Sequence, residues 1–220
     1  MSNISTTMKN KFWLALVAVL ALGTATTLFF QQKKAQASPS GYPIGATVAD
    51  FKLQNVNGTS VSLSNYKDKK GVIVVFTCNH CPFAKAYEER IMGLDKKYAS
   101  QNFPVLAINS NDGADYEEDS FDNMKKRASE KGYTFPYLQD ITQAVAKAFG
   151  ATRTPHVFIL RNDGGKFMVQ YIGTIDDNYQ DPSSVTKRYV EDAVNNILTG
   201  KPVVVTQTKA VGCAIGWKDA

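Results

Sequence analysis

The sequence is poor in several residue types, and each shortage excludes a class of protein. It holds three cysteines and two histidines among its 220 residues. A zinc ribbon would need a second Cys-x-x-Cys or a His-x-x-x-His pair, and the chain has neither. No basic stretch is interleaved with aromatic residues, so nucleic acid is not an expected partner. No internal repeat is present, and we expect one globular domain with an appendage.

Acidic residues are absent from residues 1–41, which contain four lysines. The whole chain has a net charge of +5, so the remainder carries only +1. The sequence pI of about 9.0 is therefore largely a property of the N-terminal segment.

The N-terminal segment contains an apolar run at residues 12–30 with two lysines just before it. The run is just long enough to span a bilayer, and the Ala-Gln-Ala that ends at Ala37 fits signal-peptidase cleavage. We predict a signal peptide or membrane anchor over residues 1–37 and a linker over 38–44. Either would place the rest of the chain outside the cytoplasm, in the periplasm or cell envelope, with membrane contact through this segment alone.

The most informative stretch is GVIVVFTCNHCPFAKAYEERI, residues 71–91. Its unbroken apolar start, Val72 to Phe76, predicts a strand buried on both faces. Apolar residues four apart then predict a helix, so Cys78 and Cys81 lie where a buried strand becomes a helix. The free N–H groups of a helix N-terminus stabilise a thiolate, which favours a redox dithiol. Half a zinc site and a pair of buried structural thiols are the alternatives.

The rest of the chain predicts a mixture of strands and helices. Asn57-Gly58 indicates a hairpin, and Asp140 is placed to cap a short helix. We expect strands at 51–53, 61–63, 103–108, 151–160 and 167–172, and helices from 82 to about 100 and at about 117–131, 141–149 and 183–198.

An acidic cluster opens the helix expected at 117–131 and consists of Glu117, Glu118, Asp119 and Asp122. Its spacing is not that of a calcium-binding loop. Negative charge is favourable near a helix N-terminus, so we interpret these side chains as solvated capping residues.

This order of elements resembles the thioredoxin fold, and the chain is similar to redoxin or peroxiredoxin-like (AhpC/TSA-like) thioredoxin-domain proteins. The residues that carry the resemblance are FTCNHCPFAKAYEERI (76–91), AINSND (107–112), FPYLQDITQAVAKAFGATRTP (135–155) and VGCAIGW (211–217). It implies an α/β fold with a central mixed sheet flanked by helices. To this we add an N-terminal β-hairpin extension, an N-terminal signal or anchor helix, a domain over 45–200 and a docked tail over 201–220.

The resemblance also implies roles for individual residues. Cys78 would be the nucleophile and Cys81 the resolving thiol. Pro155 would be the cis-proline that faces the dithiol, in a loop that holds a substrate strand in related proteins. On the same basis, we assign substrate binding to Thr154, Thr77 and Asn79.

Two departures from the family pattern limit what can be carried over. Peroxiredoxins place their reactive cysteine in Pro-x-x-x-Thr/Ser-x-x-Cys, but this chain has Gly71 and Val75 at the proline and hydroxyl positions. Thioredoxins have a buried aspartate on the strand before the dithiol, and no acid lies between Gly71 and Cys78. Proton transfer by Lys85, Glu88 or Glu89 is one option, although surface charge is the simpler interpretation of each.

His80 lies inside the Cys-x-x-Cys motif. A protonated imidazole beside Cys78 would favour the thiolate and so a more oxidising couple than that of thioredoxin, which is about −270 mV. We therefore expect the helix terminus and His80 to lower the pKa of Cys78.

Taken together, these features predict a thiol–disulfide oxidoreductase that needs no organic cofactor. Its partners would be protein thiols or disulfides and a redox partner protein. The alternatives are a thiol peroxidase, a redox-inert interaction domain, and a copper-handling module that uses Cys78, Cys81 and His156, with His80 close by. The resemblance names no resident metal.

The near-terminal Cys213 makes the cysteine count odd. It is either a buried thiol beneath the tail or a third redox partner of the dithiol. The nearby Trp217 is a large aromatic residue close to a chain end, so we predict that residues 211–217 are packed onto the domain.

Overall fold

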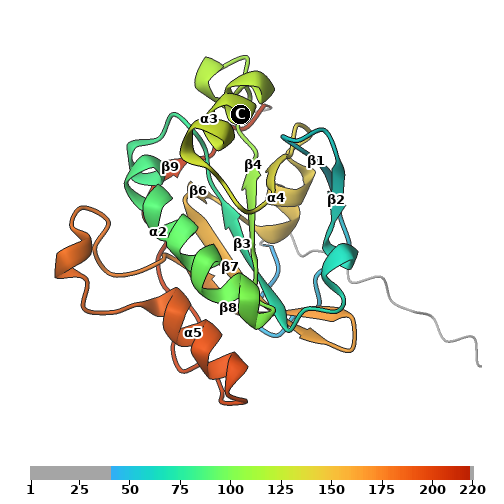
Figure 1. The fold of residues 1–220 in the computed structure, drawn as a ribbon, viewed down its shortest axis with the longest axis vertical. Coiled ribbons are helices and arrows are strands. Elements are labelled where there is room, and N and C mark those ends of the chain that lie inside the picture. Colours follow the sequence, from blue (N-terminus) through green and yellow to red (C-terminus); the bar gives the residue numbers. More distant parts are fainter. Residues whose placement is uncertain (1–40, 219–220) are drawn as a thin grey trace, which may run out of the picture. The chain divides into compact units, whose positions relative to one another are not determined.

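The computed structural model describes residues 41–218 and shows a mixed sheet of seven strands with helices on both faces (Figure 1). The α-helices are α2 (Pro82–Tyr98), α3 (Phe121–Lys131), α4 (Ala144–Phe149) and α5 (Tyr189–Leu198). The strands are β1 (Lys52–Asn55), β2 (Ser60–Ser62), β3 (Gly71–Phe76), β4 (Val105–Asn109), β5 (Tyr137–Gln139), β6 (Arg153–Thr154), β7 (His156–Asp163), β8 (Lys166–Gly173) and β9 (Cys213–Ala214). Short 3₁₀ turns are η1 (Leu63–Tyr66), η2 (Ala99–Gln101), η3 (Glu117–Asp119) and η4 (Pro182–Ser184).

The sheet has the order β2-β1-β5-β4-β3-β7-β8, and the short strands β6 and β9 form a separate pair. Strand β3 is central, since it pairs in parallel with β4 and antiparallel with β7. This arrangement confirms the α/β thioredoxin fold and the N-terminal hairpin that was predicted from Asn57-Gly58. The predicted signal or anchor helix lies outside the described residues.

Strand β3 explains how the two hydrophobic cores are organised. Every one of its residues is buried, because successive side chains point to opposite faces of a sheet that is covered on both sides. Ile73 and Val75 join the core beneath α2, α3 and α5, whereas Val72, Val74 and Phe76 join the core beneath α4. The double burial predicted from the apolar run is confirmed.

Several element boundaries differ from the predicted ones. The helix expected at 183–198 begins only at Tyr189, because Asp181 caps the η4 turn at Ser183 and Ser184 and the chain then becomes extended at Val185. Tyr42 is buried and packs edge-on against Phe149, so ordered structure begins within the range predicted as linker.

The C-terminal tail lies on the domain surface. Ile215 is buried in the core beneath α4, and Trp217 packs against the same core. Within residues 41–218, no helix combines the length and apolar character needed to cross a membrane.

Candidate redox site

The two motif cysteines lie in a loop of residues 77–81, here called the thiol loop, between β3 and α2. The N–H of Thr77 donates to the carbonyl of Ile108 at 2.8 Å, which extends the pairing of β3 with β4 by one residue. Cys81 occupies the N-cap position of α2 without a side-chain capping hydrogen bond, and Pro82 is the first residue of the helix. Proline is favoured there because the missing N–H would have no helical partner.

A second segment, residues 152–156, faces the thiol loop and is here called the proline segment. Its Thr154–Pro155 peptide bond is cis. Sγ of Cys78 lies 3.1 Å from Oγ1 of Thr154, and Sγ of Cys81 lies 3.2 Å from the carbonyl oxygen of Thr154. The structure therefore brings together four residues that were selected from the sequence, namely Cys78, Cys81, Thr154 and Pro155.

The disulfide in the structure joins Cys81 to Cys213, and Cys78 is a free, buried thiol. Strand β9 pairs antiparallel with β6, with Cys213 directly opposite Thr154. The preceding Gly212 lies so close that a Cβ atom there would be 2.2 Å from the carbonyl oxygen of Thr154. The tail thus places a third sulfur beside the motif cysteines.

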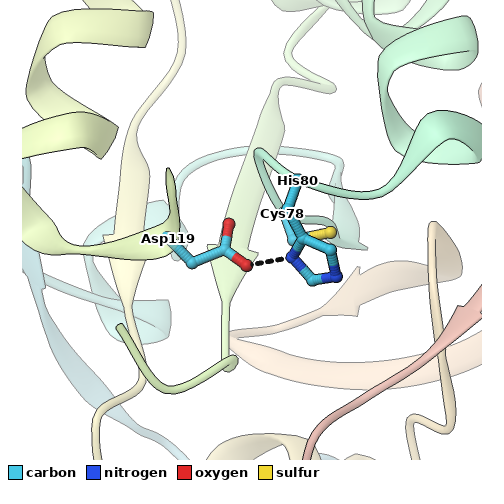
Figure 2. A group of neighbouring side chains, drawn as sticks. All are labelled: Cys78, His80 and Asp119. Atoms are coloured by element: carbon cyan, nitrogen blue, oxygen red, sulfur yellow. Dashed lines mark hydrogen bonds and ion pairs between the residues drawn. The ribbon is translucent and has the colours of Figure 1, made fainter. Parts of the chain in front are cut away.

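A buried carboxylate, Asp119, holds the thiol loop from the opposite side. Its Oδ1 accepts from the N–H of Asn79 at 2.6 Å and from Nδ2 of Asn109 at 3.0 Å. Its Oδ2 lies 2.5 Å from Nδ1 of His80 (Figure 2). The same oxygen accepts from Nδ2 of Asn111 at 3.2 Å. Asp119 has no exposed surface, so its assignment to a solvated capping cluster was wrong.

Cys78, His80 and Asp119 each offer one ligand atom, and these atoms lie within 4.8 Å of one another (Figure 2). Such a group can serve either as metal ligands or as a thiol–imidazole–carboxylate relay. Asp119 already accepts from three N–H groups, those of Asn79, Asn109 and Asn111, and its Oδ2 also faces Nδ1 of His80. This saturation favours the relay, in which Asp119 orients the imidazole.

The His80 ring is held on its face as well as at Nδ1. It stacks on the Tyr116 ring with 3.9 Å between centroids and 3° between planes. The side chain of His80 retains 17% exposure, whereas Asp119 has none. The imidazole therefore links a buried carboxylate to the surface.

The pKa of Cys78 is raised to about 11, opposite to the lowering expected from its place before a helix. Burial is the largest cause, and the negative charge of Asp119 adds to it. The hydroxyl of Thr154 and the N–H groups of Cys81 and His80 act in the opposite direction. The lowering of the Cys78 pKa by these hydrogen bonds is thus smaller than the raising by burial and by Asp119.

The other predicted site residues have different surroundings. His156 is buried, its Nδ1 accepts from the N–H of Thr152 at 3.3 Å, and burial lowers its pKa to about 4. His156 is not in the group that could hold a metal, which consists of Cys78, His80 and Asp119. The copper hypothesis had Cys81 and His156 as ligands and did not include Asp119. Glu88 pairs with Arg127 at 2.7 and 2.9 Å and therefore stabilises the contact between α2 and α3.

Asn79 has a positioning role in addition to its predicted place at the substrate side. Its Nδ2 donates to the carbonyl of Glu118 at 2.6 Å, and its Oδ1 accepts from the hydroxyl of Tyr137 at 2.9 Å. Together with the bond from its N–H to Asp119, these contacts fix the thiol loop between cysteines.

Sequence reasoning missed Asp119 and Tyr116. The available signal for Asp119 was the amide-rich segment AINSND (107–112), since Asn109 and Asn111 are natural donors to a buried carboxylate. No comparable signal marked Tyr116, which lies in a polar loop.

A thioredoxin fold with free and disulfide-bonded cysteines beside a cis-proline defines a protein of the thioredoxin-like class. The AhpC/TSA family model matches residues 44–175, and the chain belongs to this redoxin family. A thiol-disulfide oxidoreductase ResA from Geobacillus thermodenitrificans is 29% identical over 153 residues, covering 68% of this chain and 78% of that protein.

Two solved structures are also similar to this chain. An uncharacterised conserved protein from Geobacillus kaustophilus has 39% identity and a TM-score of 0.76, covering 81% of this chain and 94% of that one. A hypothetical protein from Sinorhizobium meliloti 1021 has 34% identity and a TM-score of 0.75, covering 85% and 100%. Together with the family match, the relative named thiol-disulfide oxidoreductase supports an oxidoreductase enzyme.

Proposed function

We propose that this chain is a thiol–disulfide oxidoreductase that acts on protein thiols or disulfides of the cell envelope. The observation that carries the proposal is a free Cys78 thiol beside the His80–Asp119 pair. Its sulfur contacts the hydroxyl of Thr154, and the carbonyl oxygen of the same residue contacts the sulfur of Cys81. The resemblance to a protein named thiol-disulfide oxidoreductase supports the same reaction. The apolar run at residues 12–30 supports the extracytoplasmic location.

The first step is deprotonation of Cys78. A thiol with a pKa of about 11 is almost entirely protonated near neutral pH, so the reaction needs a base close to the sulfur. His80 is that base, and Asp119 fixes its orientation through Nδ1 and stabilises the imidazolium that forms. The hydroxyl of Thr154 is placed to donate to the new thiolate.

The thiolate then attacks a client disulfide, which forms a mixed disulfide with Cys78 and releases one client thiolate. When Cys81 is reduced, its thiolate attacks Sγ of Cys78, forms the Cys78–Cys81 disulfide and releases the second client thiolate. The same steps in reverse would oxidise a client dithiol. No organic cofactor takes part, and electrons come from or go to a redox partner protein.

Reduction of insulin disulfides with dithiothreitol as the electron source tests the proposal. The wild-type chain should accelerate the reaction, and Cys78→Ser should abolish the acceleration. Cys81→Ser should leave Cys78 in mixed disulfides with envelope proteins. A matched control is Lys52→Ala, an exposed change on β1 that should leave the rate unchanged.

Equal rates for the wild-type chain and Cys78→Ser would contradict the proposal. Stopped-flow oxidation by hydrogen peroxide tests the thiol-peroxidase alternative. For the proposed exchange enzyme, the peroxide rate constant of Cys78 should be no higher than that of free cysteine.

A further inference from the structure

Three sulfur atoms converge on one residue, Thr154. Its hydroxyl contacts Cys78, its carbonyl oxygen contacts Cys81, and its backbone pairs with Cys213. Cys78, Cys81 and Ala84 form one small buried cluster against which Cys213 packs. Cys81 is therefore next to two other cysteines, although a sulfur can form one disulfide at a time.

The three cysteines differ in access to solvent. Cys81 has no exposed surface and Cys78 has 6%, whereas Cys213 is only partly buried. A reductant or oxidant approaching from solvent would therefore reach the Cys81–Cys213 disulfide from the side of Cys213.

The tail has anchors that do not depend on the disulfide. The N–H of Ile215 donates to the carbonyl of Thr152 at 3.3 Å, and the N–H of Gly216 donates to Oδ1 of Asn111 at 3.1 Å. Gln143 donates to the carbonyl of Gly216 at 2.6 Å and accepts from the N–H of Lys218 at 3.0 Å. Cys213 should consequently stay beside Cys81 after reduction, as an intramolecular thiol at high effective concentration.

We propose that Cys213 completes an internal disulfide relay in which Cys81 exchanges partners between Cys78 and Cys213. This inference rests on the proposed function, since client turnover generates the Cys78–Cys81 disulfide. The Cys213 thiolate attacks Sγ of Cys81, the Cys81–Cys213 bond forms, the Cys78–Cys81 bond breaks, and Cys78 leaves as a thiolate. One disulfide is present before and after, so no external oxidant or reductant is consumed.

The structure holds the product of this exchange, since Cys81 is bonded to Cys213 and Cys78 is a free thiol. The released Cys78 thiolate lies in a buried place next to the negative charge of Asp119, so it takes up a proton. His80 is placed to supply this proton. The relay thus returns Cys78 to its resting thiol form and moves the disulfide toward the surface.

The relay gives the site two reactive cysteines, Cys78 and Cys213, which exchange a disulfide through the buried sulfur of Cys81. Clients react at Cys78, and the redox partner reacts at the more accessible Cys213. The proteins would not have to occupy the same surface, so a client and the partner do not compete for one cysteine.

The test follows disulfides in the full chain over time. The reduced chain is mixed with one equivalent of insulin, whose disulfides react at Cys78 under the proposed function. Samples are quenched with N-ethylmaleimide at intervals, digested and mapped by mass spectrometry. The wild-type chain should show Cys78–Cys81 first and then its conversion to Cys81–Cys213. Cys213→Ser should stop at Cys78–Cys81, because no third cysteine remains to attack Cys81.

Two results would overturn the relay: formation of Cys81–Cys213 with no earlier Cys78–Cys81 species, or persistence of Cys78–Cys81 in the wild-type chain. Lys218→Ala is the matched control, because it removes a tail side chain that contacts Asp112 and no sulfur. This variant should keep the order of disulfides.

Insulin reduction measured in parallel separates the relay from the proposed function. An intact order of disulfides without acceleration of insulin reduction by dithiothreitol would overturn the function alone, whereas accelerated reduction without the order would overturn the relay alone.

Discussion

The thiol loop and the proline segment meet at the sulfur atoms, but they are held in place by different forces. The thiol loop is fixed by side-chain contacts to a buried charge, since Asn79 and His80 both bond to Asp119. The proline segment is fixed by backbone pairing, with β6 against β9 and β7 against β3. Its histidine, His156, is buried and has its pKa lowered to about 4.

This difference suits the thiol loop to proton transfer and the proline segment to positioning. A charged network can accept and return protons, so the thiol loop can change protonation state during a reaction. Backbone pairing has no titratable group, so the proline segment supplies fixed positions for a hydroxyl, a carbonyl and a proline ring. Substitutions in the thiol loop network should therefore alter turnover most, whereas changes around the proline segment should alter stability.

The largest effect is expected for Asp119→Asn. Loss of the carboxylate leaves His80 without its orienting partner, so insulin reduction should fall about 100-fold, the scale of general-base catalysis. The same change removes a negative charge that raises the pKa of Cys78, so alkylation of Cys78 by iodoacetamide near pH 8 should become faster. Opposite changes in the two rates would identify a proton relay, whereas faster rates in both assays would exclude it.

Truncation after Lys209 should have the next largest effect. It removes the buried Ile215, the packed Trp217 and the strand that pairs with β6. Measured under reducing conditions, the free energy of unfolding should fall on the order of 3 kcal/mol, as for the loss of one large buried side chain. Urea titration is the measurement, and an unchanged midpoint would show that the proline segment needs no partner strand.

His156→Gln should remove a pH dependence of stability. As the pH falls from 6.5 toward 4, an unfolded chain protonates His156 while the folded chain does not, so folding stability falls with pH across that window. Between pH 7 and pH 5 the loss should be about 2 kcal/mol in the wild-type chain. Urea titrations at both pH values should show a smaller loss for His156→Gln, which keeps an acceptor for Thr152.

The smallest effect is expected for Lys218→Ala. Its ion pair with Asp112 spans 3.2 Å between partly exposed side chains, so its loss should cost less than about 1 kcal/mol. The melting temperature should barely change. A large decrease would mean that surface charge, and not apolar packing, holds the tail beside the proline segment.

The fold could be predicted because its signals are local. An unbroken apolar run identified β3, the Asn57-Gly58 pair identified the hairpin, and the spacing around Cys78 and Cys81 located the strand-to-helix junction. Boundaries failed where local preference and capping compete, as at Tyr189, where a helix begins later than its apolar pattern suggests.

The site could be predicted only in part because its remaining features are tertiary. Asp119 lies 40 residues after Asn79 in the sequence, and nothing in an acidic run distinguishes the member that becomes buried. The pKa of Cys78 was expected to fall because a helix terminus can be read from sequence, whereas burial depends on the packed structure. Neither cysteine spacing nor composition indicated that Cys81 pairs with Cys213.

The pairing of β9 with Thr154 also bears on which partners can approach the cysteines. The tail occupies the backbone edge beside the proline, and at Gly212 it lies too close to Thr154 for even one added carbon atom. An extended polypeptide cannot add to that edge while the tail is bound there. Because Cys78 is only 6% exposed, we expect narrow, protruding disulfides to react with it faster than disulfides in flat protein surfaces.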